Sequence, residues 1–458
     1  MAIALEGSLP DSGRDGLAGQ TSLSRLANHA ARNASATSAL TRGYLGLNAV
    51  SDDNSRLDPI ARTASQPTGA GVSQKTVTAA DLEPRLVKES FARLMPNASA
   101  AMEYFYARLF MANPDYLGLF PTSMTTQRER MFGELARLVW SLDNQPGCAE
   151  LLGQLGREHR RFGVTQTHYP TFFAALRDTA EHFIGRGWTA EVAAAWQVAL
   201  DYISDTMNAA AAAAAKVSPA WWIAEIVSHD LRAPGVAVIR LRPSEPLPYQ
   251  AGQYVPVQVA RWPRTWRTYS IANAPRPGGL IELHVRAIPG GQVSNTLVHH
   301  SVTGDSILLG AAGGTMTLAD SDRDLLCIAG GTGLAPIKAL VEQALAVPSG
   351  HAGRPSRLRK ITLFAGARQH FDLYDLEDLQ LLESACPALR VLPVLSDEPG
   401  YNGLSGLLPD VVLGHGLFDN TEAYICGPPA MVRQTAAVLA ASIPPGQIHH
   451  DPIPLGRS

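Results

Sequence analysis

The hydrophobic spacing of the chain changes twice, and these changes limit what it can fold into. From about residue 78 to 215, apolar residues recur at intervals of three and four, which is the period of amphipathic helices. After Trp221 and Trp222 the pattern becomes short strand-like runs separated by glycine and proline. From about residue 322, strand-like and helix-like segments alternate. The pattern predicts a multidomain chain: an all-α domain, an antiparallel β-barrel or sandwich, and an α/β domain with a parallel sheet.

Composition limits the partners and the compartment. With 458 residues, 46% of them hydrophobic, the chain is long enough for about three domains. The net charge of −3 gives no reason to expect nucleic acid as a partner, and no apolar run is long enough to span a membrane. The four scattered cysteines form no CxxC pair and fit a reducing compartment. We expect a monomeric cytoplasmic protein.

Four segments follow from these patterns. Residues 1–75 are polar and lack sustained periodicity, and we expect them to form a disordered extension. Residues 76–216 are expected to form the helical domain, with its last helix continuing into the alanine run from Ala209 to Ala215. We assign residues 217–321 to the β domain and residues 322–458 to the α/β domain.

Two histidines lie nine positions apart in the helical domain. His159 shares one helical stripe with three apolar residues at spacings of three and four, namely Leu152, Leu155 and Phe162. His168 lies outside that stripe, in an expected turn. Spacing alone leaves two interpretations of His159: a core histidine satisfied by one hydrogen bond, or a ligand.

Four short motifs follow one another in the second half of the chain. They are RTYS (preceded by a GQY), GGQVSN, GGTGLAP and CGPP, which begin at Arg267, Gly290, Gly330 and Cys426. A glycine-rich turn between a strand and a helix lets backbone N–H groups approach a pyrophosphate. Ligands of open α/β sheets bind at the carboxyl ends of strands, where CGPP is expected to lie. No single one of these motifs is specific for a function, but their order along the chain is informative.

With these motifs in this order, residues 220–458 resemble the ferredoxin–NADP reductase superfamily. The resemblance implies that Tyr269 covers the isoalloxazine ring of FAD, that Ser270 lies near its N5 atom, and that Arg267 neutralises the pyrophosphate. It also implies the following binding residues: for FAD, Tyr254, Arg267, Thr268, Tyr269, Ser270, Gly291, Gln292, Val293 and Ser294; for NADH or NADPH, Gly331, Thr332, Gly333, Leu334, Ala335, Pro336, Cys426, Gly427 and Pro428.

The helical domain, over about residues 78–210, resembles the globin domain of flavohaemoglobins. The features that carry the resemblance are Phe105-Tyr106, the segment ending in Phe120-Pro121, Gln127, His159 and Tyr169. The resemblance makes His159 the proximal ligand of the iron of haem b. It makes Tyr106 and Gln127 donors to bound dioxygen, Phe120 the aromatic that wedges the haem, and Tyr169 a hydrogen-bonding neighbour of the proximal histidine.

Two residues depart from the family pattern. The family pairs the proximal tyrosine with a glutamate late in the last helix, where Ala211 stands here, so we expect the imidazole to have less anionic character. Asp205 is an alternative acid on the same segment. Ile453 stands where the family often has an aromatic that stacks on the flavin, so access of the nicotinamide is expected to be unusual.

The resemblance implies a nitric oxide dioxygenase. NAD(P)H reduces FAD, FAD passes single electrons to haem, and oxygenated haem converts nitric oxide to nitrate, so the partners are dioxygen and nitric oxide. Two alternatives stay open at this stage: a globin-based gas sensor or oxygen carrier whose reductase keeps its iron ferrous, and a reductase of an external oxygenase with a vestigial globin. Arg368, after the strand-like run ITLFAGA, could meet the 2′-phosphate of NADPH or be merely solvated.

Overall fold

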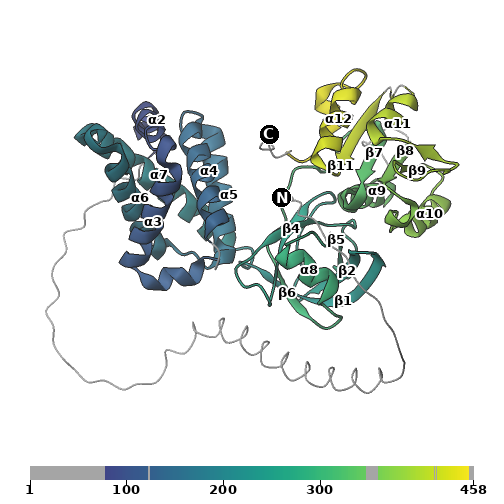
Figure 1. Cartoon of the computed structure of the whole chain (residues 1–458), viewed down its shortest axis with the longest axis horizontal. Coiled ribbons are helices and arrows are strands. Elements are labelled where there is room, and N and C mark those ends of the chain that lie inside the picture. Colours follow the sequence, from purple (N-terminus) through teal and green to yellow (C-terminus); the bar gives the residue numbers. More distant parts are fainter. Residues whose placement is uncertain (1–77, 122–123, 347–358, 417, 419, 453–458) are drawn as a thin grey trace, which may run out of the picture. The chain divides into compact units, whose positions relative to one another are not determined.

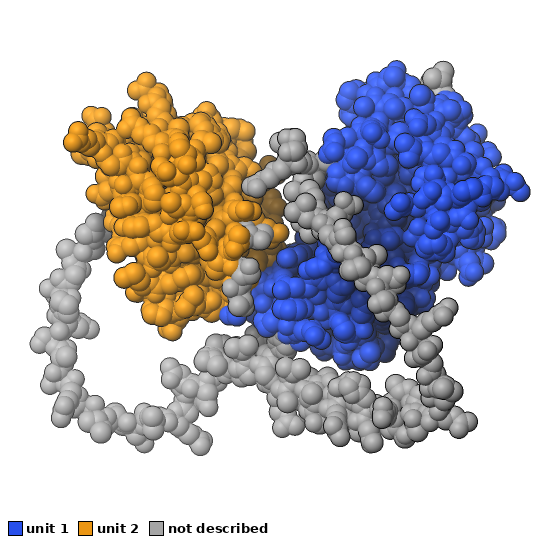
Figure 2. All heavy atoms as spheres, in the orientation of Figure 1, with its two compact units in different colours: residues 1–16, 221–458 blue, residues 17–220 orange. Residues whose placement is uncertain are grey.

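The computed structural model describes residues 78–121, 124–346, 359–416, 418 and 420–452. The expectation for residues 1–75 lies outside these residues. The described chain divides into two compact units, one up to Ala220 and one from Trp221 onward (Figure 2). No helix of the described part is long and apolar enough to cross a membrane.

The first unit is helical, as the spacing predicts. Its α-helices are α2 Pro84–Ala92, α3 Ala98–Ala112, α4 Thr125–Ser141, α5 Gln145–His159, α6 Tyr169–Ile184 and α7 Ala190–Ala215 (Figure 1). They pack around one apolar core rich in aromatic side chains. The alanine run forms the end of α7, because alanine favours the helix even where few side chains pack on it.

The next part is a six-stranded antiparallel sheet in the order β4-β3-β6-β1-β2-β5. Its elements are β1 Trp222–Ala233, β2 Val236–Pro243, β3 Tyr254–Val259, β4 Arg267–Ser270, β5 Ile281–Arg286, α8 Gln292–His299 and β6 Ser306–Leu309. A bridge between Ile271, just after β4, and Leu283 on β5 joins the two ends of this order. The sheet therefore closes as a barrel around an apolar interior.

The last part is a parallel sheet in the order β10-β9-β8-β7-β11-β12. Its strands are β7 Asp324–Gly330, β8 Ile361–Ala367, β9 Leu389–Leu395, β10 Leu404–Ser405, β11 Thr421–Cys426 and β12 Ile448–His449. Helices α9 Leu334–Ala346 and α10 Leu376–Ala385 cover one face, and α11 Leu408–Gly414 and α12 Pro429–Leu439 the other (Figure 1). Successive residues of β7 alternate between the two cores because side chains of a strand alternate in direction.

Candidate functional site

The helical domain holds His159 with a defined tautomer. His159 ends α5, and its Nδ1 lies 2.6 Å from the carbonyl oxygen of Leu155, one turn earlier. A carbonyl oxygen can only accept, so Nδ1 carries the proton and Nε2 keeps its lone pair. Burial lowers the pKa of His159, which keeps the ring neutral near neutral pH. A neutral imidazole tied to a backbone carbonyl fits the axial ligand of haem iron.

The structure brings together three further residues expected in a haem pocket. Tyr106 on α3 is buried, and its hydroxyl accepts a hydrogen bond from Nε2 of Gln127 at 3.4 Å, from the first turn of α4. The rings of Tyr106 and Phe120 meet edge to face at 5.4 Å. Burial raises the pKa of Tyr106 to about 12, so its phenol stays protonated and able to donate. This donor set, a phenol and an amide beside aromatic rings, suits a small diatomic ligand.

The remaining expected residues of this domain lie on or beside α6 and α7. Tyr169 is buried at the start of α6, with its ring 5.8 Å from that of Phe173. His168, expected in a turn, is instead the last residue of the short 3₁₀ helix η5 Gln166–His168, where its Nδ1 accepts the N–H of Thr165. Ala211 is half-buried on α7 and Asp205 on the same helix is exposed. Ile453 lies outside the described residues.

Gly156 positions the proximal helix, and the sequence patterns do not single it out. A Cβ atom at Gly156 would lie 2.2 Å from the backbone oxygen of Met207 on α7. Only glycine therefore allows α5 to lie this close to α7, three residues before His159. A glycine inside a helical pattern was the available signal, because such a residue usually has a packing reason.

The RTYS segment forms β4, which pairs with β3 of the barrel. In this register Tyr254 faces Ser270 and Val255 faces Tyr269 across the two strands. Burial raises the pKa of Tyr269 well above its usual range, so its phenol is neutral. A Cβ atom at Gly314 would lie 3.1 Å from the ring of Tyr254, a close approach that the sequence patterns also missed.

The GGQVSN segment forms the start of α8, beside the barrel. Gly291 precedes the helix and no side chain caps it, so the first N–H groups of α8 remain available to an anion. The hydroxyl of Ser294 accepts the N–H of Ile288 at 3.4 Å, and Arg267 donates to the carbonyl of Trp266 at 2.8 Å. Backbone donors at the start of a helix fit a pyrophosphate, and Arg267 on β4 carries the positive charge expected to neutralise it.

The GGTGLAP and CGPP segments meet at the carboxyl edge of the parallel sheet. The strand order reverses between β7 and β11, and Gly331–Gly333 follows β7 while Cys426 ends β11. A Cβ atom at Gly333 would lie 2.4 Å from the carbonyl oxygen of Cys426, so the two segments touch through backbone alone. Gly331 has a positive φ of 55°, which glycine adopts without strain. This edge is where open α/β sheets bind nucleotides.

A pocket opens at the same edge, beside the ends of β7 and β8. Its lining includes Ala329, Gly331, Gly366, Tyr374 and Asp375. Tyr374 and Asp375 are buried and were absent from the residues expected from sequence, because no motif marks the segment between β8 and α10. Burial raises the pKa of the nearby Cys426 thiol to about 12, so it is present as a neutral thiol.

Comparison with known families assigns each part. Residues 103–207 match the globin family, residues 223–317 the oxidoreductase FAD-binding domain, and residues 327–437 the oxidoreductase NAD-binding domain. The chain is therefore a globin joined to an FAD- and NAD-binding oxidoreductase module, with haem, FAD and a nicotinamide nucleotide as cofactors. This is the domain composition of a flavohaemoglobin, and the family resemblance read from the sequence is confirmed.

A solved structure shows the same architecture. The chain is similar to a flavohaemoglobin from Malassezia yamatoensis that contains FAD and haem, with a TM-score of 0.63 and 17% identity. The similarity covers 79% of this chain and 97% of that chain. At this identity the match establishes the fold, in which a globin precedes the barrel and the parallel sheet.

Curated relatives that are reductase components of oxygenase systems match about half of the chain. The reductase component of the naphthalene 1,2-dioxygenase/salicylate 5-hydroxylase systems of a Ralstonia species is 36% identical over 229 residues, or 49% of this chain. The electron transfer component of a xylene/toluene monooxygenase of Pseudomonas putida is 33% identical over 210 residues, or 45% of this chain. The chain spans 65% and 56% of the lengths of these two relatives.

Proposed function

We propose that this oxidoreductase is a nitric oxide dioxygenase, which uses NADH or NADPH and dioxygen to convert nitric oxide to nitrate. The observation that carries the proposal is the contact between Tyr106 and Gln127 in the domain that also holds the neutral imidazole of His159. When bound, haem supplies the iron centre for dioxygen chemistry, and FAD converts a two-electron donor into a source of single electrons.

The residues of this chain would hold and orient the reactants. His159 would bind the haem iron through its free Nε2, with its Nδ1–H held by the carbonyl oxygen of Leu155. The hydroxyl of Tyr106 would donate to the diatomic ligand while it accepts from Gln127, so one phenol orients the ligand and is itself oriented. Phe120, whose ring packs on that of Tyr106, would line the haem pocket.

The reductase part would bind its two cofactors through the segments described above. Tyr269, Ser270, Arg267 and the start of α8 would hold FAD, and Gly331–Pro336 with Cys426 would hold the nicotinamide nucleotide. In this proposal the globin spans residues 76–216, and the reductase begins at residue 217.

The test uses the full chain loaded with haem and FAD. Nitric oxide consumption is followed with an electrode in the presence of dioxygen and NADH or NADPH, and nitrate is measured as the product. We expect turnover that His159→Ala abolishes and that Tyr106→Phe reduces. Consumption of nitric oxide at the same rate in the wild type and in His159→Ala would contradict the proposal.

A second function is favoured by the identity to oxygenase reductases. The 33% and 36% identities to such components would fit a chain that passes electrons to an external iron–sulfur acceptor. Steady-state reduction of an added [2Fe–2S] ferredoxin separates the two functions. If the ferredoxin is reduced as fast in His159→Ala as in the wild type, and nitric oxide is not consumed, the second function replaces the first.

A further inference from the structure

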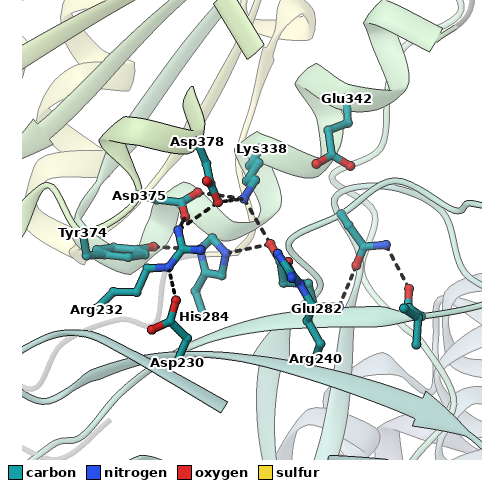
Figure 3. Close-up of polar contacts among 12 residues, drawn as sticks. Asp230, Arg232, Arg240, Glu282, His284, Lys338, Glu342, Tyr374, Asp375 and Asp378 are labelled. Carbon is teal, nitrogen blue, oxygen red and sulfur yellow. Dashed lines mark hydrogen bonds and ion pairs between the residues drawn. The ribbon is translucent and has the colours of Figure 1, made fainter. Parts of the chain in front are cut away.

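A buried network of charged side chains joins the barrel to the α/β domain (Figure 3). The barrel contributes Glu282 from β5 and Arg232 from β1, and the α/β domain contributes Lys338 from α9 and Asp375 from the start of α10. Nζ of Lys338 lies 3.0 Å from Oε1 of Glu282 and 2.8 Å from Oδ2 of Asp375. Arg232 donates to Asp375 and Asp378. One lysine charge is therefore shared between carboxylates of two domains.

The central groups of this network are withdrawn from water. The side chains of Glu282, Lys338 and Asp375 keep 3%, 8% and 0% of their exposure. Burial alone would raise the pKa of Glu282, but the hydrogen bond of His284 and the charges of Lys338 and Arg240 outweigh it and hold that pKa well below its usual range. A buried ion pair adds little stability over a well-packed apolar contact. The ion pair instead fixes how the two domains are arranged, because only one arrangement brings its charges into contact.

The backbone of Glu282 is hydrogen-bonded to the segment that follows β4, the strand expected to carry the flavin ring. Its N–H donates to Oδ1 of Asn273 at 2.6 Å, and its carbonyl oxygen accepts the N–H of Ala272 at 2.7 Å. Ala272 comes two residues after Ser270, the last residue of β4. The backbone of Glu282, whose side chain binds Lys338, is therefore hydrogen-bonded to the residues that directly follow the strand expected to carry the flavin ring.

Lys338 lies on α9, the helix that directly follows the glycine-rich turn. It follows Gly333 by five residues, a helical rise of about 7.5 Å. One turn further, Oε2 of Glu342 accepts the N–H of Ala274 at 3.0 Å. Helix α9 is thus bonded to the barrel at two points: Lys338 donates to Glu282, and Glu342 accepts from Ala274. Figure 3 shows Lys338 and Glu342 on this helix.

We propose that the Lys338–Glu282 pair is a positioning device that sets the register of the dihydronicotinamide over the flavin ring. The step it serves breaks the C4–H bond of the dihydronicotinamide and forms a bond at flavin N5, so the nucleotide loses two electrons and FAD gains them. Lys338 and Glu282 act through the backbone that they hold. The inference deepens the reductase activity alone and does not depend on the nitric oxide reaction.

The test measures hydride transfer in the full holoprotein. FAD reduction by NADH is followed anaerobically in a stopped-flow instrument, with C4-deuterated and ordinary nucleotide, for the wild type, Lys338→Met and Glu282→Gln. We expect reduction to slow by about 10- to 100-fold, because a displacement of about 1 Å has effects of this size. We also expect a larger deuterium isotope effect, with unchanged apparent affinity for the nucleotide and unchanged FAD and haem content.

Arg240→Met is the matched control. Arg240 donates to the same carboxylate at 2.8 Å, but it lies on β2 of the same barrel and its side chain is 45% exposed. Its removal breaks no bond between the two domains, so FAD reduction should keep the rate and isotope effect of the wild type.

The double variant Lys338→Met/Glu282→Leu separates positioning from stability. It leaves no unpaired lysine or glutamate at this site, so its melting temperature should recover relative to the single variants, while hydride transfer stays slow. Hydride transfer at the wild-type rate in the double variant, or in single variants that retain FAD, would overturn the proposal. If Lys338→Met loses FAD, the same measurements are made on Glu342→Ala, which removes the bond between α9 and Ala274. If the wild type reduces FAD rapidly but does not consume nitric oxide, the result counts against the proposed function only.

Discussion

The globin and reductase parts build their candidate sites in different ways. In the globin, side chains project from helices and each depends on one bond, as in His159 with Leu155 and Gln127 with Tyr106. In the reductase, backbone segments meet where a side chain would not fit, as at Gly333 and Cys426. The globin site therefore depends mainly on the identity of its side chains, with Gly156 as a backbone contact behind His159, whereas the reductase site depends mainly on backbone shape. Different kinds of substitution should therefore disable the two sites.

The largest expected effect is the loss of haem from His159→Ala. Without the imidazole the iron has no axial ligand from this chain, and we expect haem content to fall far below one per chain, with FAD and the reduction of ferricyanide retained. The Soret band and the pyridine haemochrome measure this. His168→Ala is the control and should leave haem in place, because Nδ1 of His168 already accepts the N–H of Thr165 in a short 3₁₀ helix. Full haem content in His159→Ala would refute the assignment.

A smaller but still severe effect is expected from Gly333→Ala. Its Cβ atom would lie 2.4 Å from the carbonyl oxygen of Cys426, so the GGTG and CGPP segments must separate. We expect FAD reduction by NADH to slow by about 100-fold, with haem content unchanged. Gly446→Ala is the control, because nothing lies within 4 Å of its added Cβ atom. Equal rates for both variants would show that this contact does not matter.

Tyr106→Phe should have an intermediate effect confined to the globin. Loss of one donor is expected to speed dioxygen dissociation by about tenfold, the equivalent of about 1.4 kcal/mol. Because burial raises the pKa of Tyr106 to about 12, the wild-type rate should stay constant up to about pH 10, where an unperturbed phenol begins to ionise. Stopped-flow ligand displacement measures both. Tyr116→Phe, which loses only a bond to Thr171 at 3.5 Å, is the control.

The smallest effect is expected from Ala211→Glu. Nδ1 of His159 is already bonded to the carbonyl of Leu155, so a new carboxylate must compete with that bond. We expect the iron–histidine stretch in resonance Raman to rise and nitric oxide turnover to increase by less than about tenfold. Asp205→Asn should change neither, because Asp205 is exposed. A weaker stretch in Asp205→Asn would show that this acid has taken over the role of the missing glutamate.

Local patterns predicted most elements of the fold. The helical stripes, the runs that became β2, β3, β5 and β6, and the strands before GGTG and CGPP are all present. The long first strand, β1, and the strand β9 were missed. Bulges interrupt the register of β1 after Ile226 and Leu231, and β9 contains Pro393, so neither shows a simple alternation.

Candidate site residues could be predicted from the sequence wherever they belong to a local motif. Tyr106 and Gln127 were expected as a pair and lie in contact, and the GGTG and CGPP segments were expected at one site and touch. The ligand roles assigned to these residues stay predictions. Gly156, Gly314, Tyr374 and the charged network were not foreseen, because each acts through a partner that is remote in sequence.

The sequence by itself determined the order of the three domains and the residues that line up along helices and strands, because hydrophobic period and turn chemistry are local properties. The cofactor classes came from the resemblance of its motifs to known families. Only the tertiary structure decided that Lys338 meets Glu282, 56 positions away, and that Arg232 meets Asp375, 143 positions away. Such pairs exist only because the barrel and the α/β domain bring residues remote in sequence together. Their charges are ordinary in the sequence and become informative only once burial removes the water that would otherwise solvate them.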